Sequence, residues 1–138
     1  MRDFITFLNE KMFDDYEALA SKFTKLFKKY GLKKVKSFKV PNAGMSVQYE
    51  MSIDCGSTKY KLIIRREPAV STDYNYVYSM YSLKDLNTEE EFITKRYFIP
   101  ETVNNYVNFE TLLKTITTAN KCDTIKNSIK AFTTHHSI

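Results

Sequence analysis

The sequence contains a run of lysines that no carboxylate interrupts. Between Glu17 and Glu50 there is no acidic residue, although the formal net charge of the whole chain is only +5. That interval holds eight lysines: Lys22, Lys25, Lys28, Lys29, Lys33, Lys34, Lys36 and Lys39. An unopposed positive stretch is typical of a surface that meets phosphates, anionic lipid or an acidic protein. A solvated face that keeps the protein soluble is an equally weighted alternative.

The use of lysine rather than arginine indicates the kind of contact to expect. Lysine carries a point charge and lacks the planar guanidinium with which arginine reads base edges. Binding through these side chains would therefore tolerate different nucleic-acid sequences, and its affinity would fall steeply as salt rises.

A second basic set occurs in a predicted strand, where Lys59, Lys61 and Arg65 alternate with apolar residues. In another predicted strand Tyr74, Tyr76 and Tyr78 share one face. If both sets faced solvent on the same side, the sheet would resemble a stacking platform for single-stranded nucleic acid. If the tyrosines faced the core, they would serve packing, which is the commoner role. The aromatic–basic signature of RNA-recognition domains is absent from the sequence.

The other reactive side chains form no catalytic or metal-binding motif. The acidic cluster Asp85, Glu89, Glu90 and Glu91 flanks Thr88, which predicts a capped helix start with dipole-matched charges. His135 and His136 are the only histidines, and no third ligand lies near them in sequence. We therefore predict no enzyme activity, no catalytic residue, no metal site and no cofactor.

The two cysteines, Cys55 and Cys122, are far apart in sequence and have no Cys or His at ligand spacing. Two cysteines do not define a disulfide framework, so the sequence predicts two reduced thiols in a cytosol-like compartment. The start of the chain does not read as a signal peptide, and no apolar run is long enough for a membrane span. We expect a cytoplasmic protein, or one of the host cytoplasm if it is viral.

Apolar periodicity predicts helix over the first thirty residues, with Gly31 as the C-terminal cap. Asp14 followed by Glu17 resembles a capping box, which predicts a break near Phe13. The apolar and lysine positions of residues 14–30 fall on opposite sides of such a helix.

The middle of the chain alternates as strands do, and the last third returns to helical spacing. Strands are expected over 35–40, 45–53, 59–65 and 74–83, with a fifth over 92–99 that Pro100 ends. Asn108 and Asp123 are the predicted N-caps of two further helices, and residues 133–138 are expected to form a flexible tail. The sequence thus predicts one α+β domain over residues 1–138, with helices on one face of an antiparallel meander.

These features favour a small non-enzymatic binding protein that docks on nucleic acid or a ribonucleoprotein through its basic helix and strand. Residue usage biased towards AT-rich codons fits a virus-encoded accessory or anti-defence factor. The alternative is a protein–protein inhibitor or adaptor that uses exposed tyrosines against an acidic patch of one partner. Binding of the basic helix to a membrane surface is a third possibility. The sequence gives no oligomeric state.

Overall fold

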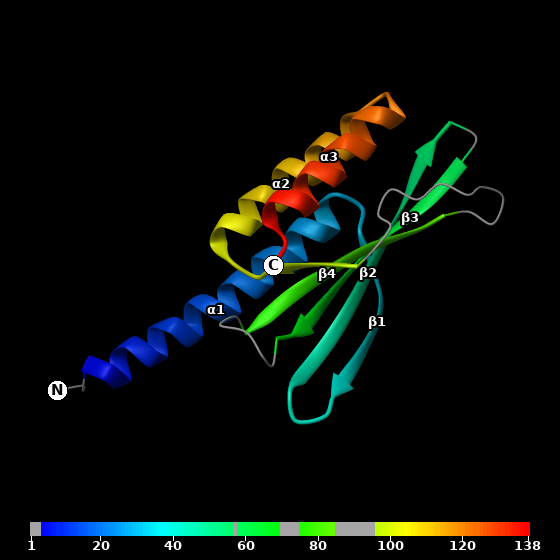
Figure 1. The fold of residues 1–138 in the computed structure, drawn as a ribbon. Helices are drawn as coiled ribbons and strands as arrows, with labels where there is room; N and C mark the ends of the chain where they lie inside the picture. The colour runs from blue at the N-terminus through cyan, green and yellow to red at the C-terminus, as the bar shows by residue number, and fades with distance from the viewer. Residues whose placement is uncertain (1–3, 57, 70–74, 85–95) are drawn as a thin grey trace.

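The structure, a computed structural model, describes the chain except for residues 1–3, 57, 70–74 and 85–95; of residues 4–16, 58 and 84 it describes the backbone only. A long helix is followed by five strands and two further helices (Figure 1). The elements are α1 (Phe4–Lys29), β1 (Lys33–Val40), β2 (Gly44–Cys55), β3 (Thr58–Pro68), β4 (Tyr76–Lys84), β5 (Tyr97–Pro100), α2 (Val103–Thr118) and α3 (Cys122–His136). The predicted α+β architecture is confirmed.

The five strands form one antiparallel sheet in the order β1-β2-β3-β4-β5, so each strand pairs with its neighbours in sequence. All three helices lie on the same side of this sheet (Figure 1). Antiparallel sheets commonly have one face packed on the core and another in contact with solvent. The alternating sequence of β2 follows this rule in its second half, where Tyr49, Ile53 and Cys55 are buried on the helix side. In its first half Ser46 and Gln48 are buried on the other face and Met45 is 45% exposed. The acidic segment with Asp85, Glu89, Glu90 and Glu91 lies outside the described residues.

Helix α1 is continuous, so the predicted break near Phe13 is wrong. The segment contains neither Gly nor Pro, the residues that most often interrupt a helix, and Asp14 is accommodated within it. Its 26 residues correspond to about 39 Å, and its first half extends past the sheet (Figure 1). The predicted end is confirmed: Gly31 has a φ of 90°, and the amides of Gly31 and Leu32 bond the carbonyls of Lys28 and Phe27, closing a Schellman motif.

The last two helices begin earlier than predicted. Thr102, rather than Asn108, caps α2, because its hydroxyl accepts a hydrogen bond from the amide of Asn105 at 3.1 Å. Helix α3 begins at Cys122 with Lys121 as its N-cap, which places Asp123 inside the first turn. A carboxylate is also favourable there because of the helix dipole.

The predicted flexible tail over 133–138 is wrong. Helix α3 continues to His136, and Thr133 is only 1% exposed. The amide of Ile138 then donates a hydrogen bond of 2.8 Å to the carbonyl of Phe98 in β5. The segment is therefore fixed by the packing of α3 and by the hydrogen bond to the edge strand β5. Neither contact can be recognised from a short polar sequence.

Four aromatic rings form the centre of the core. Phe23 and Phe27 of α1, Tyr78 of β4 and Phe109 of α2 are each 0% exposed. Every pair of these four rings is in contact, with centroids 4.7–5.9 Å apart. Aromatic pairs of this geometry stabilise beyond the area they bury. The cluster therefore fixes α1 and α2 on the middle of the sheet.

A disulfide joins Cys55, the last residue of β2, to Cys122, the first residue of α3, with the two Cα atoms 5.0 Å apart. The prediction of two reduced thiols is therefore wrong. The cysteines are 67 positions apart, and the chain between them folds back so that the end of the β2–β3 hairpin meets the start of α3; the sequence separation alone did not reveal this approach. Disulfides persist in oxidising compartments, so the cysteines no longer support a reducing one.

We expect the disulfide to stabilise the fold by roughly 2–4 kcal/mol, because it closes a long loop in the unfolded chain. Reduction should lower the midpoint of urea unfolding. The variant Cys55→Ala/Cys122→Ala should unfold at the midpoint of the reduced wild type, with or without reductant. An unchanged wild-type midpoint after complete reduction, verified by thiol titration, would contradict this expectation.

Candidate polyanion-binding surface

The lysines of α1 lie on its outer side. Phe23, Leu26 and Phe27 point into the core and are 0–3% exposed. The lysines next to them in sequence are exposed: Lys22, Lys25, Lys28 and Lys29. Lys28 and Lys29 also occupy the last turn, where the helix dipole favours cations. The predicted division of this helix into an apolar and a basic side is confirmed.

The remaining four lysines of the acid-free interval lie on β1, an edge strand whose residues are all exposed except the partly buried Val40. The register places Lys34 and Lys39 opposite Tyr49 and Met45, on the helix side of the sheet. Lys33 and Lys36 lie opposite Glu50 and Gln48, on the other side. An irregularity between Lys34 and Lys36 leaves Val35 unpaired. Lysines on an edge strand also hinder unwanted strand pairing, which is the structural alternative for this set.

None of these eight ammonium groups has a carboxylate within 4.0 Å in the part of the chain that the structure describes. Lys59 of β3 also has no described carboxylate within 4.0 Å, whereas the other three cations of β3, namely Lys61, Arg65 and Arg66, and Arg96 just before β5 differ. Their partners lie close, at 3.8 Å for Lys61–Glu50, 3.6 Å for Arg65–Glu67, 2.6 Å for Arg66–Glu101 and 3.0 Å for Arg96–Glu67. The positive charge of α1 and β1 is therefore uncompensated, whereas that of the central strands is largely paired.

Lys59, Lys61 and Arg65 lie on the sheet face that the helices leave uncovered. They are thus separated by the sheet from the lysines of α1. They share their face with only two of the eight, Lys33 and Lys36. Asp54 is the cross-strand neighbour of Lys59, and Glu50 pairs with Lys61, so this set adds less free charge than the sequence implied.

The predicted tyrosine contact surface is wrong for Tyr78, which is fully buried on the helix side. Tyr76 shares that side and is partly exposed, with the Arg66 guanidinium carbon 3.6 Å from its ring centroid. Tyr74 lies outside the described residues. Among the described residues, the aromatic side chains that share the face of Arg65 are those of Phe38, Tyr81 and Phe98.

A buried polar network surrounds the hydroxyl of Tyr78. The hydroxyl donates to Oε2 of Glu101 at 2.6 Å, and the same carboxylate accepts from Nε and Nη2 of Arg66 at 2.6 and 2.9 Å. Burial, followed by the charge of Glu101, raises the pKa of Tyr78 well above its ordinary value of 10.0. The network satisfies the buried charge of Glu101 with donors from Tyr78 and Arg66.

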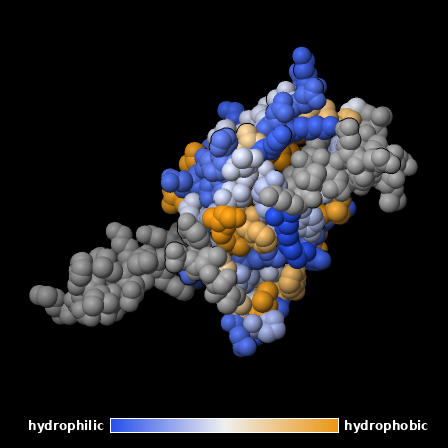
Figure 2. Space-filling model, in the orientation of Figure 1, coloured by the Kyte–Doolittle hydropathy of each residue, from blue (hydrophilic) through white to orange (hydrophobic). Residues whose placement is uncertain are grey.

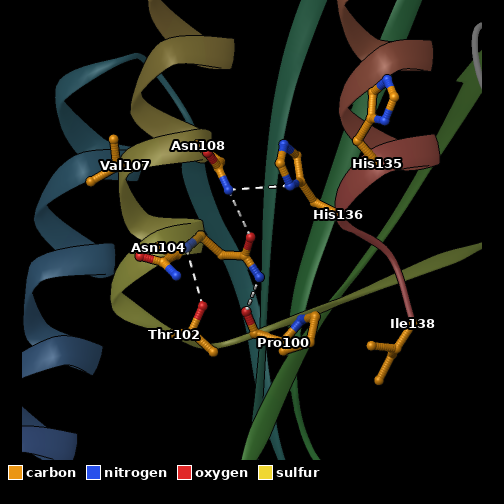
Figure 3. Close-up of a pocket in the computed structure, with 9 residues that line it drawn as sticks. Pro100, Thr102, Asn104, Val107, Asn108, His135, His136 and Ile138 are labelled. Carbon is orange, nitrogen blue, oxygen red and sulfur yellow. Dashed lines mark hydrogen bonds between the residues drawn. The ribbon is translucent and has the colours of Figure 1, made fainter.

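A hollow of about 640 Å³ lies between the start of α2 and the end of α3 (Figure 3). The side-chain nitrogen Nδ2 of Asn108 donates to the side-chain oxygen of Asn105 at 3.0 Å and to Nδ1 of His136 at 3.2 Å. Asn105 in turn donates to the carbonyl of Pro100 at 2.9 Å. His136 is therefore an ordered member of a hydrogen-bond network and not part of a frayed tail.

The imidazoles of His135 and His136 line this hollow, and no Asp, Glu or Cys side chain does so in the part of the chain that the structure describes. The Thr102 hydroxyl is engaged as the N-cap of α2. Hydrophobic side chains gather near the C-terminus in the space-filling view, while hydrophilic ones dominate over α2 and α3 (Figure 2).

No group of three metal-binding side chains occurs among the described residues, and no described helix is long and apolar enough to cross a membrane.

Comparison with protein-family models, with curated proteins and with solved structures finds no match to this chain. The geometry and charge of the described residues are therefore the basis for a functional proposal.

The raised pKa of Tyr78 makes stability sensitive to alkaline pH. Because the folded state holds this proton more tightly, the stabilisation is complete below about pH 10 and is lost as the pH rises above it. The wild-type free energy of unfolding should fall there by up to about 1.4 kcal/mol per pH unit more than that of Tyr78→Phe.

Urea titrations across the pH range measure both slopes. Between about pH 7 and 9 the two curves should run parallel, with Tyr78→Phe lower by roughly 1.5–3 kcal/mol for the lost bond to a charged acceptor. Identical slopes above about pH 10 would mean that Tyr78 does not hold its proton in the folded state.

Proposed function

We propose that this protein is a non-enzymatic binding protein whose surface of α1 and β1 lysines docks on a polyanion, namely nucleic acid or a ribonucleoprotein. The single observation that supports the proposal is the contrast in charge pairing. All eight lysines of this surface are exposed and without a described carboxylate within 4.0 Å, whereas arginines of the central strands have partners. The phosphates of a nucleic acid would supply the negative charge that no described carboxylate brings within 4.0 Å of these lysines.

The two alternatives have less support. The adaptor hypothesis depended on exposed tyrosines, and Tyr78 is buried. Membrane-surface binding requires a helix with a free apolar side, and Phe23, Leu26 and Phe27 of α1 are occupied in the core. A partner protein with an acidic patch remains compatible with the lysines but gains no aromatic anchor from Tyr78.

The test is fluorescence anisotropy with a DNA duplex and with single strands at low and high salt. Each lysine that neutralises a phosphate contributes about 0.7–0.9 to the slope of log affinity against log salt. The variant Lys25→Gln/Lys28→Gln/Lys34→Gln removes two lysines of α1 and one on the helix side of β1, and it should bind more weakly and reduce that slope by about two to three.

The matched control removes three exposed lysines of α2 and α3, as Lys114→Gln/Lys121→Gln/Lys130→Gln, and so changes the net charge equally. It should retain most of the wild-type affinity and slope. Equal losses in both variants would indicate a general charge effect rather than this surface. Wild-type binding weaker than about 100 µM at low salt would refute the proposal.

A further inference from the structure

We propose that the sheet face opposite the helices binds single-stranded nucleic acid by stacking bases on Phe38 and Phe98. This inference rests on the proposed polyanion function and names its substrate class. It starts from two large aromatic rings that remain exposed, Phe38 at 39% and Phe98 at 38%, on the two edge strands of the sheet.

The strand register places both rings on the face opposite the helices, where Ser46, Gln48 and Ser79 between them are 0–6% exposed. Phe38 of β1 lies opposite Ser46, which shares its side of β2 with Gln48. Gln48 lies opposite Arg65 of β3, Arg65 opposite Ser79 of β4, and Ser79 opposite Phe98 of β5. Because directly paired residues point to the same side, Phe38 and Phe98 stand at opposite ends of one band across the sheet.

Arginines hold these rings from inside the band. The Arg65 guanidinium carbon lies 5.4 Å from the centroid of Phe38. The guanidinium carbon of Arg96 lies 5.2 Å from the ring centroid of Tyr81 and 5.9 Å from that of Phe98. We call these five residues the aromatic–arginine band. Rings and guanidinium planes side by side are the surfaces on which unpaired bases stack.

Hydrogen bonds fix both arginines before any ligand arrives. Nε of Arg65 donates to Oε1 of Gln48 at 3.1 Å, and Nη2 of Arg96 donates to Oγ of Ser79 at 3.0 Å. Glu67 is shared between the two, at 3.6 Å from Arg65 and 3.0 Å from Arg96. One carboxylate against two guanidinium groups leaves the band with a net positive charge.

The charge of the whole face favours a nucleic acid over an acidic or neutral protein as the occupant. Its described acidic residues are fewer than its basic ones: Glu50, Asp54 and Glu67 against Lys33, Lys36, Lys59, Lys61, Arg65 and Arg96. Lys36 is two residues from Phe38 on the same side of β1, so a phosphate can lie beside a stacked base. A chain that needs both stacking and phosphate contacts is a nucleic acid with unpaired bases.

The dimensions suit a short single strand. Four inter-strand spacings separate β1 from β5, which corresponds to roughly 19 Å across the face. Sheet surfaces that bind single strands span at least about four nucleotides. A duplex cannot offer its base faces to such a surface, so stacking predicts a preference for single strands.

The experiment compares Phe38→Leu/Phe98→Leu with Phe38→Tyr/Phe98→Tyr. Leucine keeps exposed apolar bulk without a ring, and tyrosine keeps the ring, so the pair isolates stacking. Circular dichroism and thermal unfolding check that both variants are folded. The probes are oligothymidylate of about twelve nucleotides and a duplex of the same length, in anisotropy titrations at low salt.

The leucine variant should bind the single strand at least tenfold more weakly, because each stacked base contributes about five- to hundredfold. The leucine variant should bind the duplex with wild-type affinity. The tyrosine variant should bind both the single strand and the duplex with wild-type affinity. Equal weakening for duplex and single strand, or no weakening at all, would overturn the stacking inference while leaving the lysine surface intact. A wild-type protein that binds neither probe would refute the proposed function as well.

Discussion

The contact among Phe23, Phe27, Tyr78 and Phe109 is the interaction on which the rest of the fold depends. One ring comes from the sheet and three come from the helices, so the cluster places both α1 and α2 on one face. Because Tyr78 carries a hydroxyl, the same interaction requires a buried acceptor, and Glu101 supplies it. Glu101 in turn requires Arg66, which links β3 to the segment between β5 and α2.

This arrangement explains why charge is distributed as it is. Phe23, Leu26 and Phe27 place the inner side of the second half of α1 in the core, so the four lysines of that half face outward. The helices do not cover the edge strand β1, whose side chains are exposed on both sides. Lys61, Arg65 and Arg66 of β3 pair with Glu50, Glu67 and Glu101, and Lys59 is the β3 cation without a described partner within 4.0 Å. Cations without a described partner therefore lie mainly on α1 and the edge strand β1, whereas paired cations lie mainly on the central strands.

The sequence was sufficient for elements whose signal is local. The apolar spacing of α1 predicted a helix with the correct buried side, and Gly31 predicted its end. Alternation in β2 predicted a strand, but its buried side is correct only from Tyr49 onward, because Ser46 and Gln48 are buried and Met45 is exposed. Features that depend on distant segments were missed. The approach of Cys55 to Cys122 and the anchoring of Ile138 on Phe98 arise only after the layers have packed. The side of β4 that carries Tyr78 was also ambiguous, because Ser79, Tyr81 and Leu83 made the opposite side no more polar.

The two edges of the sheet are closed to further strands by different means. At β5 the backbone hydrogen bond from Ile138 occupies the carbonyl of Phe98, so the protein itself supplies a partner to that edge. At β1 the backbone is exposed, but four lysines in eight residues would bring like charges together if two copies paired there. Growth of the sheet by self-association is therefore disfavoured at both ends. The chain can carry two exposed phenylalanines and remain protected from edge-to-edge aggregation.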